Sequence, residues 1–452
     1  RCILDFVATD GDWEDIFKDG NTVNNKSAPW YDWYNNDSNP ACPAGDNGYV
    51  IWCSNEAYQD PNNTIPGFSW YEDGDTNFVS VIFDAYNDDG ILGEKLCSPY
   101  EIANQTCFDD EGQQILLECD FNDVNQYCIN NLNEVAEAMV APGKGILAAD
   151  ESTGTIGKRF DQIDTESTEQ TRNAYRDLLF SSDGFEEYIS GVIMYDETLR
   201  QSSLKDNSPY PEYLTSLGVI PGIKVDAGAH SLAGTEDEKI TSGLDGLDER
   251  LEEYRELGAR FAKWRAVINI TATNPSDYCI QTNAHALARY AALCQANDIV
   301  PIVEPEILMD GEHDIEDSFV VTEEVLRTVF NELYTQGVQL EEMILKPNMV
   351  LSGYDSQERA GVDEVASATV QCFLRSVPAA VPGIAFLSGG QSDEDATAHL
   401  NAMNQILGDN KPWNLSFSYG RALQQPALKA WQGKDENVTK AQDAFLKRAK
   451  LN

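Results

Sequence analysis

The sequence predicts an α/β fold: a barrel of eight parallel strands alternating with helices, preceded by a small β-rich or irregular domain. Eight apolar runs between residues 146 and 420 end in charged, hydroxyl or glycine residues, a pattern typical of buried parallel strands with a functional edge. Stretches with the spacing of amphipathic helices separate these runs. The composition also changes near residue 130, where a segment rich in Asn, Asp, Gly and Cys ends. We therefore expect two domains, 1–130 and 131–452.

Short alternating apolar runs indicate β structure in the first domain. Residues 49–53 and 78–83 alternate like half-buried strands, and turn sequences at 61–63 and 88–90 separate such runs. Five of the eight tryptophans also lie in this domain. They fit either a core that is poor in aliphatic side chains or a surface that stacks on sugars or proteins.

Cysteines are concentrated in the first domain, which predicts a disulfide framework in an oxidising compartment. A zinc site is the alternative, but no Cys-x-x-Cys pair occurs and no histidine precedes His230. Because the cysteines of this domain are odd in number, one is free, pairs with another chain or pairs with the second domain. The candidate disulfide cysteines are Cys2, Cys42, Cys53, Cys97, Cys107, Cys119 and Cys128.

Glycosylation sequons and the first residue bear on the cellular compartment. Four of seven Asn-x-Ser/Thr sequons lie in the first domain, and the chain begins Arg-Cys rather than with Met, so the preceding segment either was removed as a signal peptide or is simply not included in this sequence. We expect the secretory pathway or the extracellular space. The alternative is a plastid or cytoplasmic protein whose first domain responds to thiols. The candidate glycosylation sites are Asn25, Asn36, Asn62 and Asn104.

The net charge of −45 restricts the partners of the protein. Residues 1–130 carry 4 Lys+Arg and 25 Asp+Glu, and the remainder carries 27 and 51, so both parts are strongly acidic. Such a surface repels nucleic acid and anionic membranes, and no apolar run is long enough to cross a bilayer. A saline medium, a calcium-rich store or simple solubility each accounts for the excess. A phosphate site would need a local group of cations.

The second domain opens with a helix and then alternates strands and helices. Apolar spacing over 132–140 predicts the first helix, which leads into a turn at 141–145. Amphipathic helices are expected between the strands, for example at 244–257 and 282–296. The eight strands are expected at 146–150, 191–196, 222–226, 262–268, 299–307, 343–349, 383–390 and 415–420.

Lys346 follows the sixth apolar run and is a candidate imine-forming nucleophile. Such a lysine must be partly neutral near pH 7, so its pKa must be lowered by burial or by neighbouring cations. Lys263 is expected at the carboxyl end of the fourth strand and Glu304 at that of the fifth, which places both beside Lys346. A carboxylate between two amines can carry the protons that imine formation requires.

Seven motifs of the second domain resemble those of class I fructose-bisphosphate aldolases. Three of them are Val-Glu-Pro-Glu at 303–306, Leu-Lys-Pro-Asn-Met at 345–349 and Leu-Ser-Gly-Gly-Gln at 387–391. The resemblance extends from about residue 131 to the end and leaves residues 1–130 uncovered. The other four motifs lie at 145–154, 222–226, 261–265 and 417–421.

The resemblance implies reversible cleavage of fructose 1,6-bisphosphate into dihydroxyacetone phosphate and glyceraldehyde 3-phosphate. Lys346 would form the Schiff base, Glu304 would carry protons during imine formation, and Lys263 would assist and contact a hydroxyl. Asp150 would deprotonate the hydroxyl whose collapse breaks the carbon–carbon bond, and Glu306 is a further catalytic candidate. We expect no cofactor and no metal, because the four histidines form no cluster in the sequence.

Phosphate recognition is expected at two places. Glycine-rich turns after the seventh and eighth strands can cradle an anion with backbone N–H groups, and an arginine matches phosphate geometry. The resemblance assigns this first place to the ketone-half phosphate, with Ser388, Gly389, Gly390, Gly420 and Arg421. It assigns the opposite phosphate to Lys224, Arg265, Ser152, Lys158 and Arg159.

The resemblance also implies a homo-oligomer, either a tetramer or a larger assembly formed through the first domain. Family members usually continue into a tail whose terminal tyrosine assists proton transfer, and this sequence stops soon after Ala449. A second hypothesis is a secreted structural protein that reuses an aldolase barrel as a scaffold. Disulfides and sequons favour that hypothesis, whereas retention of every mapped catalytic residue favours the enzyme.

Overall fold

The computed structural model describes residues 68–73, 78–83, 132–408 and 411–452. Contacts divide the chain into two units, Arg1–Val124 and Asn125–Asn452. The domain limit near residue 130 stays a prediction. The candidate disulfide cysteines and the four candidate glycosylation sites of the first domain lie outside the described residues, as does the run 49–53.

Two described strands belong to the first unit. Strand β1 (Phe68–Asp73) pairs antiparallel with β2 (Phe78–Phe83), with Phe68 opposite Phe83. The alternating run expected at 78–83 is β2.

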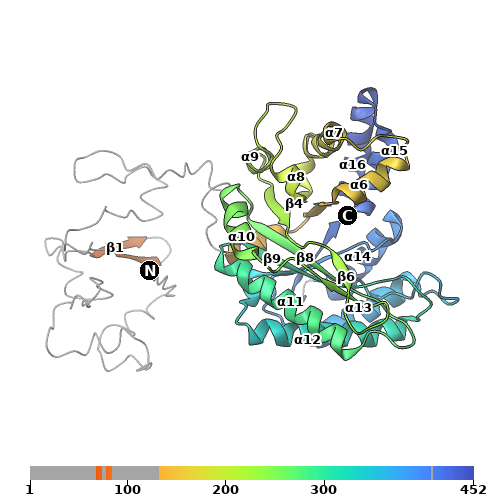
Figure 1. The fold of residues 1–452 in the computed structure, drawn as a ribbon. Coiled ribbons are helices and arrows are strands. Elements are labelled where there is room, and N and C mark those ends of the chain that lie inside the picture. Colours follow the sequence, from red (N-terminus) through yellow and green to blue (C-terminus); the bar gives the residue numbers. More distant parts are fainter. Residues whose placement is uncertain (1–67, 74–77, 84–131, 409–410) are drawn as a thin grey trace, which may run out of the picture. The chain divides into compact units, whose positions relative to one another are not determined.

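The second unit contains the expected closed barrel of eight parallel strands (Figure 1). Each strand pairs with the next barrel strand along the chain, and β12 pairs with β3 to close the ring. The strands are β3 (Gly145–Ala149), β4 (Ile189–Met194), β5 (Ile220–Lys224), β8 (Phe261–Ile268), β9 (Val300–Ile307), β10 (Ile344–Leu345), β11 (Gly383–Phe386) and β12 (Asn414–Tyr419).

All eight expected strands form, but their lengths differ from the prediction. Strand β10 holds two residues where seven were expected. Lys346 N still donates to Val303 O, at 2.8 Å, but Pro347 has no N–H with which to continue the ladder. In contrast, β8 and β9 pair along eight residues each. The long ladder therefore carries Lys263 and Glu304 inside strands rather than at their ends.

Helices surround the barrel, and α11, α12 and α13 lie along one side of it in Figure 1. The helix expected at 282–296 begins earlier, because Ser276 caps it by accepting from Cys279 N. The longer helices are α6 (Thr153–Asp161), α7 (Glu169–Phe180), α10 (Leu247–Glu256), α11 (Asp277–Ala296), α12 (Ile315–Thr335), α13 (Val362–Ser376), α14 (Asp393–Leu407), α15 (Arg421–Trp431) and α16 (Val438–Leu451). Two short helices, α8 (Asp196–Leu199) and α9 (Tyr210–Ser216), follow β4.

The first helix of this unit, α5 (Leu132–Met139), closes the amino-terminal end of the barrel. Its apolar face forms one buried cluster with side chains from inside the strands, among them Ile146, Phe261 and Ile344. Val140, just after the helix, occupies the space in which Gly383 would otherwise carry a Cβ, 2.6 Å away. The expected helix at 132–140 therefore forms the floor of the barrel. A site for substrates can open only at the carboxyl-terminal end of the described strands.

A small hairpin, which the sequence did not predict, follows β5. It consists of β6 (Ala229–Ser231) and β7 (Lys239–Thr241), which pair antiparallel. Glu238 anchors it, because its buried carboxylate accepts hydrogen bonds from Ser276 N and Oγ, both at 2.7 Å.

Candidate active site

A cavity of about 670 Å³ opens at the carboxyl-terminal end of the barrel strands. Every catalytic and phosphate-binding residue expected from the sequence lines it except Gly390. The expected residues come from seven of the eight strands or the loops that follow them, and Tyr195 adds the loop after β4, so the barrel brings together side chains that are far apart in the sequence.

Glu304 lies between the two buried lysines. Its Oε1 is 3.3 Å from Lys346 Nζ, and its Oε2 is 3.5 Å from Lys263 Nζ. All three side chains are at most 5% exposed. The carboxylate is therefore in direct reach of both amines and is shielded from bulk water.

Lys263 is surrounded by carboxylates. Asp150 Oδ2 lies 2.7 Å from its Nζ, and Asp226 Oδ2 lies 3.8 Å away. Burial favours the neutral amine, but Asp150, Glu304 and Asp226 outweigh it and raise the pKa of Lys263 above its ordinary value. Lys263 is thus held as an ammonium.

Asp150 is held as a carboxylate by the same charges. Burial alone favours the neutral acid, but the positive charges of Lys263, Lys346 and Lys224 outweigh it. They hold the pKa of Asp150 well below its ordinary value. A carboxylate that is ionised near neutral pH can accept a proton from a bound hydroxyl.

Asp226 ends the motif at 222–226, and the sequence predicts no role for it. Its Oδ1 accepts from Lys224 Nζ at 2.6 Å and from Gly228 N at 3.1 Å, while its Oδ2 faces Lys263. The carboxylate is buried and joins the β5 lysine to the β8 lysine. Its position at the end of an expected strand could have indicated a role in the site, because the other charged residues of the site were predicted from the same kind of position.

Glu306 does not reach the two amines through a recorded contact. It forms an ion pair with Arg265, which lies on the neighbouring strand β8. Burial lowers the pKa of Arg265, but Glu306 outweighs this effect and raises it. Glu306 therefore orients the guanidinium of Arg265 at the edge of the cavity, where Arg265 remains 41% exposed.

The expected turn for the ketone-half phosphate follows β11. Gly389 and Gly390 have φ of +58° and +98°, which only glycine adopts readily. A Cβ at Gly390 would lie 3.1 Å from Arg421 Nη2, so the guanidinium packs against the turn. Arg421 begins α15, whose first N–H groups have no acceptor within the helix. The turn, the helix start and the guanidinium together can bind an anion.

Ser418, the second-last residue of β12, was not predicted from the sequence as a site residue. Its Oγ is buried, lines the cavity and has no hydrogen-bond partner among the described residues. A buried hydroxyl without a partner is unfavourable unless a ligand completes it. Its place two residues before Gly420 was the available signal.

In the second group of expected phosphate-binding residues, two side chains already have partners within the protein. Ser152 caps α6 by accepting from Thr155 N at 3.4 Å, and Arg159 pairs with Glu151. Glu151 also binds Arg176, at 2.6 Å, and accepts from Gln424 at 2.9 Å. Arg159 is therefore partly neutralised, whereas Lys158, also at the cavity wall, has no recorded partner within the described part of the chain.

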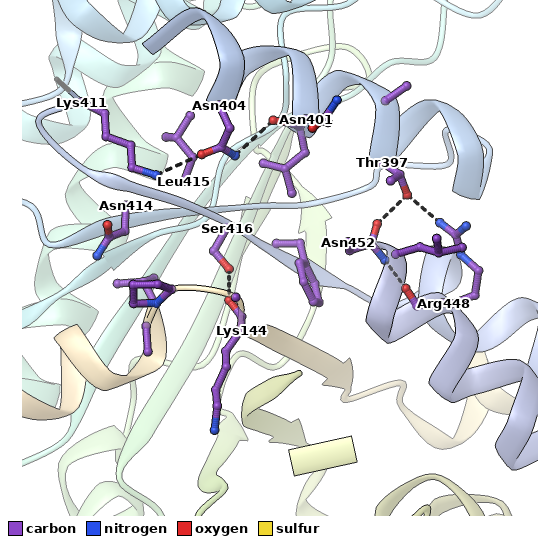
Figure 2. Close-up of a pocket in the computed structure, with 18 of the residues that line it drawn as sticks. Lys144, Thr397, Asn401, Asn404, Lys411, Asn414, Leu415, Ser416, Arg448 and Asn452 are labelled. Atoms are coloured by element: carbon purple, nitrogen blue, oxygen red, sulfur yellow. Dashed lines mark hydrogen bonds between the residues drawn. The ribbon is translucent and has the colours of Figure 1, made fainter. Parts of the chain in front are cut away.

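A second cavity, of about 790 Å³, lies at the other end of β12 (Figure 2). None of the expected catalytic or phosphate-binding residues lines it. Two of its cations, Lys411 and Arg448, are engaged with the protein, because Lys411 donates to Asn404 at 3.0 Å and Arg448 to Thr397 at 2.7 Å. The candidate site is therefore the smaller cavity.

No group of three or more His, Cys, Asp or Glu side chains in residues 68–73, 78–83, 132–408 and 411–452 has the arrangement of a metal site. None of the helices in these ranges has the length and apolarity needed to span a membrane.

Comparison with known proteins identifies one family. Residues 131–452 match the family model described as glycolytic class I fructose-bisphosphate aldolase. A probable class 1 fructose-bisphosphate aldolase of Xylella fastidiosa is 58% identical over 325 residues, 72% of this chain and 96% of that protein. Cytosolic fructose-bisphosphate aldolase 4 of Arabidopsis thaliana is 57% identical over 311 residues, 69% of this chain and 79% of that protein.

A solved structure resembles the barrel as well. The fructose-bisphosphate aldolase of Plasmodium falciparum, in a complex with TRAP and a small-molecule inhibitor, is 51% identical and has a TM-score of 0.69. The match covers 71% of this chain and 92% of that chain. These likenesses support the enzyme over the scaffold hypothesis.

Proposed function

This chain belongs to the class I fructose-bisphosphate aldolase family, and on that premise we propose that Lys346 forms the Schiff base with the ketone substrate. The enzyme is a lyase that cleaves fructose 1,6-bisphosphate into dihydroxyacetone phosphate and glyceraldehyde 3-phosphate. The observation that carries the assignment of Lys346 is its buried amine, 3.3 Å from a carboxylate that also reaches Lys263.

Imine formation needs a base and an acid beside the amine. Lys346 Nζ attacks the ketone carbon, and Glu304 takes a proton from the nitrogen and returns one to the departing hydroxyl, which leaves as water. Lys263, held as an ammonium, fixes Glu304 and donates to a substrate hydroxyl. The product is a protonated imine on Lys346.

Cleavage needs a base at the next hydroxyl. Asp150 removes its proton, the oxyanion collapses to an aldehyde, and the electron pair of the broken carbon–carbon bond moves into the imine to give an enamine. The positive nitrogen is the electron sink. The low pKa of Asp150 keeps it unprotonated for this step.

The phosphates hold the substrate at both ends. Arg421, the glycine turn and Ser388 suit the ketone-half phosphate, with Ser418 as an added hydroxyl. The opposite phosphate is assigned to a second group of residues, with Lys158 its least engaged cation. That group consists of Lys224, Arg265, Ser152, Lys158 and Arg159.

Reductive trapping tests the assignment of Lys346. Borohydride with dihydroxyacetone phosphate is expected to leave one mass adduct on Lys346 in the whole chain. Lys346→Met is expected to lose both the adduct and at least about 10⁴-fold of kcat, because no imine forms. Lys205→Met, at an exposed lysine, is the matched control and should keep both. An adduct elsewhere, with Lys346 unmodified, would refute the assignment.

The two parts of the chain favour different cellular compartments. The cytosolic relatives support the cytoplasmic alternative for the barrel, whereas a secretory location rests on the sequence of 1–130 alone. Free thiols in the native protein separate the two by mass spectrometry. Reduced cysteines throughout 1–130 favour the cytoplasm, and paired ones favour the secretory pathway.

Family membership supports an oligomer, and we propose a tetramer rather than a larger assembly built by the first domain. Light scattering on the purified chain is expected to give four copies of 50.1 kDa. A larger mass that falls to this value when residues 1–130 are removed would favour the assembly instead.

A further inference from the structure

The turn after β11 has an unusual backbone, and two of its N–H groups have no recorded acceptor among the described residues. Gly389 and Gly390 are both left-handed, and a Cβ at Gly389 would lie 2.3 Å from Met309 Cε. Within the described residues, neither the Gly389 nor the Gly390 N–H donates a recorded hydrogen bond. Because a trans peptide is planar, its C=O and N–H point in opposite directions. The direction of the Gly389 carbonyl therefore fixes that of the Gly390 N–H.

The Gly389 carbonyl is held by a residue that the sequence analysis did not assign. Tyr354 Oη lies 3.3 Å from Gly389 O and 3.2 Å from Met309 Sδ. The carbonyl is the stronger acceptor of the two. Burial raises the pKa of Tyr354 to about 12, against the opposing charges of Arg421 and Arg359, so the phenol keeps its proton and can donate it.

Tyr354 is itself fixed by its loop. Three consecutive N–H groups, of Gly353, Tyr354 and Asp355, donate to the loop after β9 at 2.8, 2.8 and 2.9 Å. The two loops approach so closely that a Cβ at Gly353 would lie 2.1 Å from Gly311 O. The phenol is therefore presented by a rigid support and not by a mobile side chain alone.

We propose that Tyr354 is a positioning residue for the ketone-half phosphate: its hydroxyl holds the Gly389 carbonyl from behind and thereby directs the Gly390 N–H into the anion site. Tyr354 does not line the cavity, so it acts through the turn and not on the substrate. The inference rests on the proposed function, because that function places the phosphate at this turn.

The substitution Tyr354→Phe removes the hydroxyl and keeps the ring. In the condensation direction, the KM for dihydroxyacetone phosphate is expected to rise about 3- to 10-fold, the effect of one lost hydrogen bond. The KM for glyceraldehyde 3-phosphate and kcat should stay within about twofold, because the other phosphate binds elsewhere. A general structural defect would change both KM values.

Tyr334→Phe is the matched control, since Tyr334 is 86% exposed on α12 and should change neither KM. An unchanged KM for dihydroxyacetone phosphate in Tyr354→Phe, or an equal rise of both KM values, would overturn the inference. Failure of the proposed function gives a different result: the wild-type chain would then neither cleave the bisphosphate nor form the Lys346 adduct.

Discussion

At the scale of single residues, the two buried lysines of the site differ in the number of carboxylates around them. Lys263 has three carboxylates within 3.8 Å of its nitrogen, whereas Lys346 has one recorded ion-pair partner. The same group of charges holds Asp150 ionised. One cluster of charges thus raises the pKa of Lys263 and lowers the pKa of Asp150.

Asp150→Asn should separate imine formation from cleavage. We expect kcat to fall about 10²- to 10⁴-fold, the usual contribution of a general base, while the borohydride adduct on Lys346 still forms. Asp161→Asn, at an exposed position on α6, is the control and should keep wild-type kcat. Loss of the adduct together with kcat would show instead that Asp150 acts before cleavage.

The depressed pKa of Asp150 also predicts a pH dependence of stability. A carboxyl whose pKa is lower in the folded state stabilises the protein above its unfolded pKa of about 3.9, and this contribution is lost as the pH falls towards the folded value. Urea unfolding of the wild type and of Asp150→Asn should therefore differ most above about pH 4 and converge below it. A constant difference would contradict the pKa shift.

Individual residues also mark the limit of what the sequence predicted. Lys346, Lys263 and Glu304 were expected together because parallel strands end at one edge, and they do meet. Asp226 and Ser418 were not assigned roles, because their importance lies in contacts across strands that no spacing along the chain reveals.

At the scale of elements, strand packing depends on glycines beside large inner side chains. A Cβ at Gly222 would lie 2.2 Å from the ring of Phe261, which is fully buried. Phe261 belongs to the cluster that α5 closes. The absence of a side chain on β5 therefore makes room for the aromatic ring of β8.

Gly222→Ala is expected to destabilise the fold by about 1–3 kcal/mol, because the ring and the strand have to shift. The urea midpoint measures this. Gly157→Ala is the control, since its Cβ would meet only ordinary contacts at 3.7 Å and alanine favours the helix α6. Equal stability of the two variants would argue against the clash.

Elements also differed in how well they were predicted. The eight strands were found because long apolar runs signal burial on both faces. The hairpin of β6 and β7 was missed, since each strand has three residues and β6 is exposed throughout. It is held by tertiary contacts of Glu238, which no local pattern announces.

At the scale of the whole molecule, the described site lies entirely within the barrel unit. Residues 131–452 alone are therefore expected to keep kcat and KM for fructose 1,6-bisphosphate within about twofold of the full chain. The bacterial relative supports this, because 96% of its length aligns to 72% of this chain. Coupled-assay kinetics of both proteins provide the measurement. Loss of turnover in the shorter protein would show that the first domain contributes to catalysis.

Since the side chains of α5 fill the floor of the barrel, the described residues leave Lys346 accessible to solutes from the carboxyl-terminal end of the strands. The hexose would therefore enter, and both trioses would leave, through the same opening of the cavity. Under the proposed mechanism the ketone half is still bonded to Lys346 after cleavage, so the aldehyde leaves first. In synthesis the same mechanism requires the reverse order: the ketone triose bonds to the lysine first, and the aldehyde binds second.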